Sequence, residues 1–226
     1  MMNWSYESFR ALSNETNGLS ACRICQMVKR MKRSYRLLLA MILFLACDFL
    51  KERDFVPTGD SYTLNPGIEL IRIQKSLTRY NPTGTFSLDF IARSKSNNPE
   101  TAILPAGLFF ISQNPKVQNM IIVKDFGITV TSNTDTFTIG AFSVNEFKAL
   151  PGDSDFFQIG PITNHPDLLR IIDIVKDKKL SADNVFTVQR AIYQVTSEGS
   201  LSSAMVESLN LLPPDTKSRS RLKENL

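Results

Sequence analysis

Hydrophobic and polar residues alternate through the middle of the chain in short runs of the kind that form β-strands. Phe86, Leu88 and Phe90 occupy every second position within 85–93, which makes one face of that segment apolar. Clusters of Gly, Pro and Asn separate the runs, and no helical pattern provides the crossovers that parallel strands need. The pattern predicts an antiparallel β-sandwich over 66–162. Its strand-like runs are 68–75, 85–93, 102–112, 117–124, 127–131 and 134–145.

The period changes after Gly160 to that of an α-helix. The motif Asn164-His-Pro-Asp167 suits a helix start, since Asn or His can cap the first turn and Pro is tolerated there. Apolar residues then recur at helical spacing over 168–175 and over 183–198, and a shorter helix is expected from Ser202 until Pro213 stops it. We expect a helical hairpin packed on the sandwich over 163–212. The predicted fold class is therefore mainly β with α.

An apolar run at 37–46, preceded by a cluster of Lys and Arg, stands apart from this pattern. The order resembles a bacterial lipoprotein signal peptide, in which a positive and then an apolar segment precede the cleavage site. Ala46 supplies the small residue before Cys47, although Phe44 stands where such signals usually carry Leu. The run is about half of a bilayer span. We expect a signal peptide over 31–47, lipidation of Cys47 and anchoring to a membrane of the cell envelope; a buried core segment or an uncleaved anchor stays open.

The remaining segments flank these two parts. Residues 1–30 exceed what a signal peptide carries before its basic cluster, so Met27 or Met31 is a candidate start and 1–30 are either untranslated or a disordered extension. Residues 48–65 are polar, with Pro and Gly and no clear period, and we interpret them as a tether. Positive charge is dense near the end of the chain, which indicates a disordered tail over 213–226.

Charge excludes one class of partner once the export signal is set aside. The chain holds 26 Lys and Arg and 22 Asp and Glu, of which seven and two lie in 1–47, leaving 19 basic and 20 acidic residues. A nucleic-acid-binding domain concentrates positive charge on a folded face. The part that follows Cys47 has a net charge near −1, so no nucleic-acid partner is expected.

Two short motifs resemble those of the thioester domains of bacterial surface adhesins. Val188-Gln-Arg-Ala-Ile-Tyr193 is similar to that family's helical motif, in which an apolar residue and Gln are followed by any two residues and then by two apolar residues. Ile139-Gly-Ala-Phe-Ser-Val144 resembles its aromatic-Cys-apolar strand. The resemblance spans about 102–197 and implies a Cys thiol acylated by the Gln side chain, a thioester that reacts with host amines.

The chain departs from that family at the reacting residue. Ser143 occupies the position of the Cys, and no Cys follows Cys47, so a thioester cannot form within this domain. A relative without its nucleophile can keep a binding surface but not the covalent chemistry. We expect Ser143 and Gln189 to lie close together as a degenerate pair, with Gln189 satisfying backbone groups where helix and sheet meet.

Other reaction centres find less support in the sequence. The alternative is an envelope hydrolase that uses Ser143 or His165, with Asp155 or Asp167 orienting the histidine. The Cys22-Arg-Ile-Cys25 motif has redox or metal spacing, but a zinc site needs four ligands and His165 is the only histidine. A calcium loop at 152–155 is too short, so a solvated turn is favoured. We expect no metal and no cofactor.

Aromatic residues suggest a binding role instead. Phe109, Phe110 and Phe142 are expected in the core, because such rings bury a large area. Phe147, Phe156 and Phe157 flank the segment 149–153 and are the candidates for a binding loop. The sequence as a whole predicts a lipid-anchored, exported protein that acts as a non-enzymatic binding or structural module, with an extracellular protein or glycan as its ligand.

Overall fold

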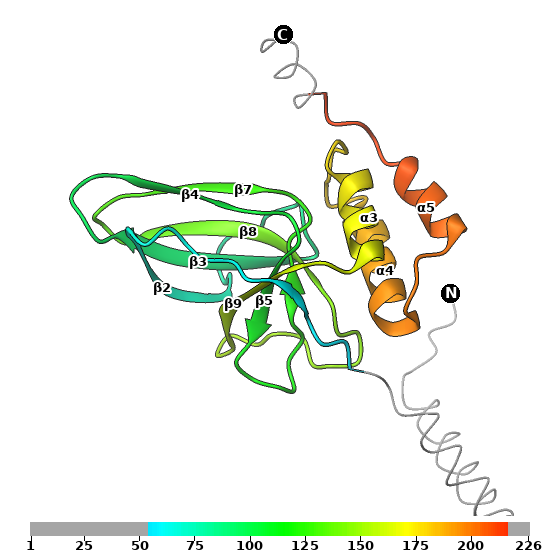
Figure 1. Cartoon of the computed structure of the whole chain (residues 1–226), viewed down its shortest axis with the longest axis horizontal. Helices are drawn as coiled ribbons and strands as arrows, with labels where there is room; N and C mark the ends of the chain where they lie inside the picture. Colours follow the sequence, from blue (N-terminus) through cyan, green and yellow to red (C-terminus); the bar gives the residue numbers. More distant parts are fainter. Residues whose placement is uncertain (1–53, 217–226) are drawn as a thin grey trace, which may run out of the picture. The chain divides into compact units, whose positions relative to one another are not determined.

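A computed structural model describes residues 54–216, in which antiparallel strands close into a barrel (Figure 1). The predictions for 1–30, for the signal peptide 31–47 and its Cys47, for the first part of the tether and for 217–226 lie outside these residues. The barrel order is β2-β3-β8-β6-β5-β9, and β9 pairs with both β5 and β2. The strands are β2 (Ile68–Lys75), β3 (Phe86–Ser94), β5 (Leu108–Ser112), β6 (Met120–Ile121), β8 (Asp135–Ser143) and β9 (Phe156–Thr163).

The prediction of a sandwich is wrong, although the mainly antiparallel β character is confirmed. The strand that closes the barrel, β9, was not among the predicted runs, because Gly160 and Pro161 interrupt its pattern. Its register with β5 shifts between Leu108 and Phe110, and such an irregularity adds the bend and twist that closure requires. Without β9 the remaining strands would leave two edges, as in a sandwich.

Three further strands lie outside the six of the barrel. β1 (Gly59–Asp60) pairs with β9, and β4 (Glu100–Leu104) and β7 (Phe126–Val130) form a separate two-stranded sheet. Buried side chains of β4 and β7 share one hydrophobic core with the barrel, including Leu104, Ile128 and Phe90. Figure 1 shows this pair of strands running along one side of the barrel.

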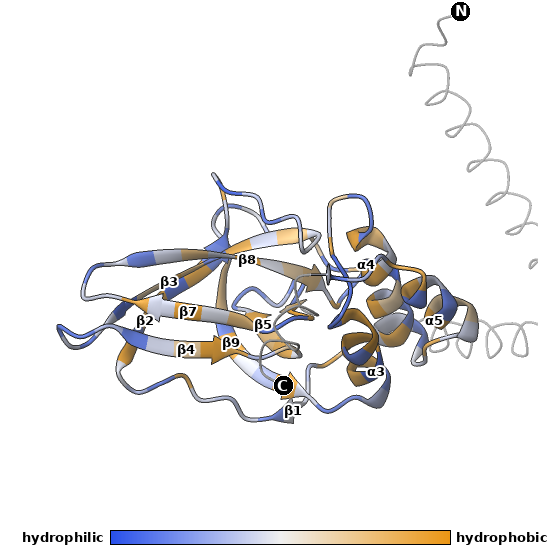
Figure 2. Cartoon of the chain, turned by 90° about the horizontal axis from the view of Figure 1, so that it is seen from above, coloured by the Kyte–Doolittle hydropathy of each residue, from blue (hydrophilic) through white to orange (hydrophobic). Residues whose placement is uncertain are grey.

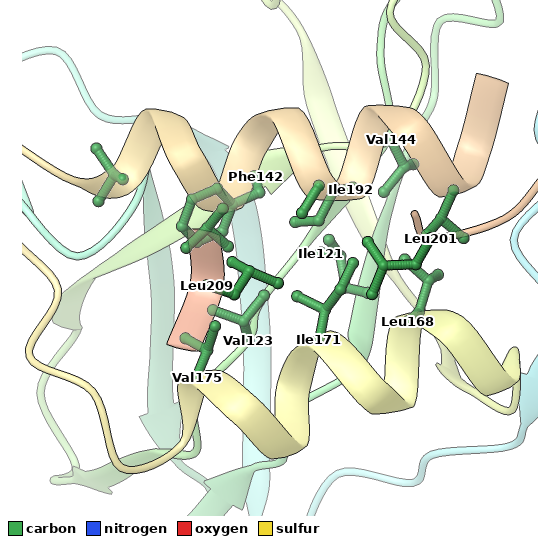
Figure 3. Close-up of a cluster of buried hydrophobic side chains, with 14 of the residues drawn as sticks. Ile121, Val123, Phe142, Val144, Leu168, Ile171, Val175, Ile192, Leu201 and Leu209 are labelled. Atoms are coloured by element: carbon green, nitrogen blue, oxygen red, sulfur yellow. The ribbon is translucent and has the colours of Figure 1, made fainter. Parts of the chain in front are cut away.

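Helices pack against the face of strands β5, β6 and β8 that does not contribute to the barrel core. They are α3 (Pro166–Val175), α4 (Val185–Tyr193), a π-helical turn (Gln194–Glu198) and α5 (Ser203–Asn210). The region 163–212 is therefore helical, and α5 lies where the shorter third helix was expected. Their apolar faces meet the barrel in a second core, where Leu168 and Ile171 of α3 and Ile192 of α4 surround Ile121 and Phe142 (Figure 3).

Neighbouring residues of the central strands serve the two cores alternately. In β5, Phe109 joins the helix-side core and Phe110 the barrel-side core, and both are fully buried. In β8, Ala141 belongs to the barrel side and Phe142 to the helix side, as the two-residue period of a strand requires. The expected core roles of Phe109, Phe110 and Phe142 are confirmed. Figure 2 shows the resulting apolar segments along strands and helices, with polar residues in many of the connecting loops.

The tether predicted for 48–65 is wrong over the residues that the structure describes. The Phe55 ring lies 6.0 Å from that of Phe109, β1 pairs with β9, and the Tyr62 hydroxyl donates to the Ile103 carbonyl at 2.8 Å. Phe55, Tyr62 and Leu64 of this segment gain burial against the hydrophobic cores, which outweighs the weak local pattern. The predicted tail also begins too early, because Pro214 forms a β-bridge with Lys178.

Candidate functional site

The candidate site lies where helix α4 meets the last residue of strand β8. Gln189 is on the buried face of α4, and the residue is only 7% exposed. Its Oε1 accepts from the Ser143 backbone N–H at 3.0 Å, and its Nε2 donates to the Ser143 carbonyl at 2.8 Å. The side-chain amide thus binds both backbone groups of one strand residue. The two residues that the sequence predicted to be neighbours are in direct contact.

Thr85 completes the polar contacts of the Gln189 amide. This residue precedes β3, and its hydroxyl donates to Gln189 Oε1 at 2.6 Å, with a longer contact of 3.5 Å to the Ala141 carbonyl. Gln189 Oε1 therefore accepts two hydrogen bonds, which uses both of its lone pairs. Sequence reasoning missed Thr85, because nothing in its local pattern distinguishes it from any other strand threonine.

The Ser143 side chain contrasts with its well-bonded backbone. Ser143 is fully buried, and its hydroxyl is one of three buried side-chain polar atoms that lack a hydrogen-bond partner within residues 54–216. Activation of a serine requires a base within hydrogen-bond reach. None of the hydrogen bonds described for 54–216 joins this hydroxyl to such a base. The arrangement can hold helix and barrel together, but it does not prepare Ser143 for attack.

Two buried asparagines extend the polar network beside Ser143. Asn145 Oδ1 accepts from the Asn119 backbone N–H at 3.1 Å, and Asn145 Nδ2 donates to the Phe55 carbonyl at 2.9 Å. Asn119 Oδ1 accepts from the Ser112 N–H at 2.9 Å. These contacts satisfy a backbone group at the end of β5, one just before β6 and the carbonyl of Phe55. The sequence analysis missed both residues, and the only signal was the presence of Asn, which disfavours strands, at the ends of apolar runs.

The residues of the alternative hydrolase are not assembled. The His165 ring lies against Phe55, with centroids 6.3 Å apart, and its Nδ1 is among the buried unpaired atoms of the described chain. Asp167 Oδ2 accepts from the Leu201 N–H at 3.1 Å, and Asp155 Oδ2 accepts from the Gly152 N–H at 2.7 Å. Both carboxylates that were expected to orient His165 are thus bonded to backbone groups elsewhere.

The three phenylalanines of the predicted binding loop have different surroundings. Phe147 is 62% exposed and Phe156 is 38% exposed, whereas Phe157 is 3% exposed and belongs to the barrel core. Phe157 is therefore wrongly assigned to a binding loop. Its neighbour Phe156 points the other way because side chains alternate along β9.

The partly buried Lys124 lies near residues that follow α3. Lys124 Nζ donates to the Lys178 carbonyl and lies 3.9 Å from an Asp215 carboxylate oxygen. Burial lowers the pKa of Lys124, and the charges of Asp215 and Asp177 oppose that shift. Between 54 and 216, no group of three or more His, Cys, Asp or Glu side chains is placed to hold a metal ion, and no helix is long and apolar enough to cross a membrane.

Comparisons with protein-family models, with curated proteins and with solved structures found no match to this chain. The interpretation of the site therefore depends on its own geometry. That geometry is a buried amide that binds a strand end, next to an unpaired hydroxyl and a network of asparagines.

Proposed function

We propose that this chain is an exported, lipid-anchored protein of the cell envelope that acts as a non-enzymatic binding or structural module. The observation that carries the proposal is the order of segments along the chain. A basic cluster and an apolar run end at Ala46-Cys47, and the folded part begins a few residues later, with Phe55 already packed on Phe109. Acyl chains on Cys47 would attach this folded part to the membrane surface.

The absence of an assembled reaction centre within 54–216 supports a non-enzymatic role. Ser143 has a buried, unpaired hydroxyl, and His165 packs against Phe55 without a carboxylate partner among the described hydrogen bonds. An envelope hydrolase that uses either residue would need them rearranged, so we rank it second.

We further propose that the domain is an inactive relative of thioester domains, with Ser143 in the place of the reactive Cys. The contact between Gln189 and residue 143 supports this relationship, because the two resembling motifs are 46 residues apart in the sequence and meet in the fold. In this interpretation Gln189 has kept its place at the strand end and has only a structural role there.

Mass spectrometry of the mature protein tests the anchoring. The full chain should be expressed in a bacterium that processes lipoproteins and extracted from its membranes with detergent. We expect an N-terminal peptide that begins with Cys47 and carries acyl chains. The matched control is Cys47→Ser, which removes the acylated thiol and should leave an unprocessed leader. A wild-type protein that retains residues 31–46, or a Cys47 without lipid, would refute the proposed function.

A further inference from the structure

The point at which the chain enters the folded part is fixed beside one particular loop, 144–155, which connects β8 and β9. Asp54 forms an ion pair with Lys148 of this loop at 3.2 Å. The carbonyl of Phe55 accepts from Asn145 Nδ2 at 2.9 Å, and the Phe55 ring packs on Phe109. Loop 144–155 is therefore next to Asp54 and Phe55, the first residues after Cys47 that the structure describes.

The covalent distance from Cys47 to this entry point is short. Seven residue steps separate Cys47 from Asp54. A fully extended chain of that length spans ~25 Å, which is the upper limit for the distance between the two residues. A compact domain the size of 54–216 has a radius of gyration of ~15 Å and hence a diameter of ~40 Å. The link is shorter than the domain, so a lipid on Cys47 would bring the side that holds Asp54 nearest to the bilayer.

Loop 144–155 presents two large apolar side chains on that side. Phe147 is 62% exposed and Leu150 is 60% exposed, although the backbone of the residues between them is held by hydrogen bonds. The Ala149 N–H donates to the Lys116 carbonyl at 3.0 Å, and Gln118 Nε2 donates to the Lys148 carbonyl at 2.9 Å. The loop backbone is thus held in place while Phe147 and Leu150 stay in contact with water. Exposed apolar residues also occur elsewhere on the domain, so what distinguishes these two is their place beside the entry point of the chain.

We propose that loop 144–155 lies on the bilayer that holds the Cys47 lipid and inserts Phe147 and Leu150 among the lipid headgroups. This inference rests on the proposed lipid anchoring and adds the orientation of the domain and a second membrane contact. Apolar side chains of surface-bound segments reach the boundary between headgroups and acyl chains, where burial removes them from water. The loop carries Glu146, Asp153 and Asp155 against Lys148, so the proposed contact depends on its apolar side chains and not on attraction to anionic lipid.

Tryptophan fluorescence in vesicles tests the contact. The only tryptophan is Trp4, so a Trp4→Phe background leaves an introduced reporter as the sole source of signal. Phe147→Trp and Leu150→Trp are compared with Ile103→Trp, a control of matched exposure (63%) on β4, which Figure 1 places on the opposite side of the barrel. Each variant is expressed as the full chain, purified from membranes after processing, and placed in vesicles of phosphatidylethanolamine and phosphatidylglycerol, with and without brominated acyl chains.

We expect brominated lipid to remove most of the emission of the Phe147→Trp and Leu150→Trp proteins and to leave that of Ile103→Trp nearly unchanged. Equal quenching at the three positions, whether strong or weak, overturns the inference. The mass of each purified protein is measured in parallel. If Cys47 is acylated and the loop reporters are not selectively quenched, the membrane contact fails while the anchoring stands, and the loop remains free for a protein or glycan. If Cys47 carries no lipid, both proposals fail together.

Discussion

Replacement of Gln189 is the most direct test of a structural role for the candidate site. In Gln189→Ala, the Ser143 N–H and carbonyl both lose the partner that the amide provides, and the Thr85 hydroxyl loses its shortest contact. The two Ser143 contacts are buried at the junction between α4 and β8, so water cannot replace the amide there without opening the contact.

The expected loss of stability follows from the number of groups left unpaired. A buried donor or acceptor without a partner costs about 1–3 kcal/mol, and two such backbone groups together with the cavity suggest a loss of about 3–5 kcal/mol. A domain has about 5–15 kcal/mol of unfolding free energy in total. The substitution should therefore remove a large fraction of the stability without necessarily unfolding the protein.

Urea unfolding followed by far-ultraviolet circular dichroism measures this loss. With a slope of about 2 kcal/mol per molar urea, the midpoint should fall by roughly 1.5–2.5 M. Gln158→Ala is the matched control, because Gln158 is an exposed glutamine on β9 and its replacement should change stability by no more than about 0.5 kcal/mol. Equal midpoints for the two variants would show that the Gln189 contacts contribute nothing to stability.

Gln189→Glu separates hydrogen bonding from cavity formation. The introduced carboxylate can accept from the Ser143 N–H but cannot donate to the Ser143 carbonyl, whereas the protonated acid can do both. Burial beside a carbonyl raises the pKa of the introduced group in the folded state above its unfolded value of about 4.3. The favourable contribution is then complete below that value and is lost as pH rises through the folded pKa. The deficit relative to wild type should shrink as pH falls from 7 towards 4, and a deficit independent of pH would contradict the assigned contacts.

Two further substitutions test the proposed kinship and the revised start of the folded part. Ser143→Cys should lose the mass of one ammonia molecule if the domain is related to thioester domains, because the thiolate would bond to the Gln189 side-chain carbon and the amide nitrogen would leave as ammonia. Ser143→Ala is the control, whose mass should show no such loss. A Cys variant that also keeps its full mass argues against the relationship. Phe55→Ala should destabilise the domain by about 1–3 kcal/mol through the lost packing on Phe109. Val56→Ala, at a residue that is 68% exposed, should stay within about 0.5 kcal/mol, and similar unfolding midpoints for the two variants would support a tether after all.

The sequence predicted the elements with a clear period and missed those that depend on distant partners. Strand β3 alternates from Phe86 to Phe90, and α3 has a proline in its first turn and an apolar stripe, so both were found. Strand β9 reads Phe-Phe-Gln-Ile-Gly-Pro-Ile-Thr, which has no simple period, and it forms because β2 and β5 both offer it an unpaired edge. Local patterns cannot reveal such an edge. The difference between a sandwich and a barrel depended on this one strand.

The same limit applies to the candidate site. Ser143 and Gln189 could be paired in advance because each lies in a motif that resembles a known arrangement. Thr85, Asn119 and Asn145 belong to no motif, and their roles follow only from which backbone groups the fold leaves unpaired. Phe157 was misassigned for a related reason, since two adjacent aromatic residues on a strand face opposite sides and the sequence does not say which side is buried.

The geometry around Gly84 explains why a glutamine is needed at position 189. The pairing of β3 with β8 ends at Phe86 and Ala141, and the chain before β3 passes so close to β8 that a Cβ on Gly84 would lie 2.3 Å from the Ala141 nitrogen. Beyond Ala141, strand β8 therefore continues to Ser143 without β3 beside it. The Gln189 amide supplies one donor and one acceptor to Ser143, as a residue of a neighbouring strand would. A side chain of α4 thus extends the hydrogen bonding of the barrel, and the helices and the barrel should unfold together rather than separately.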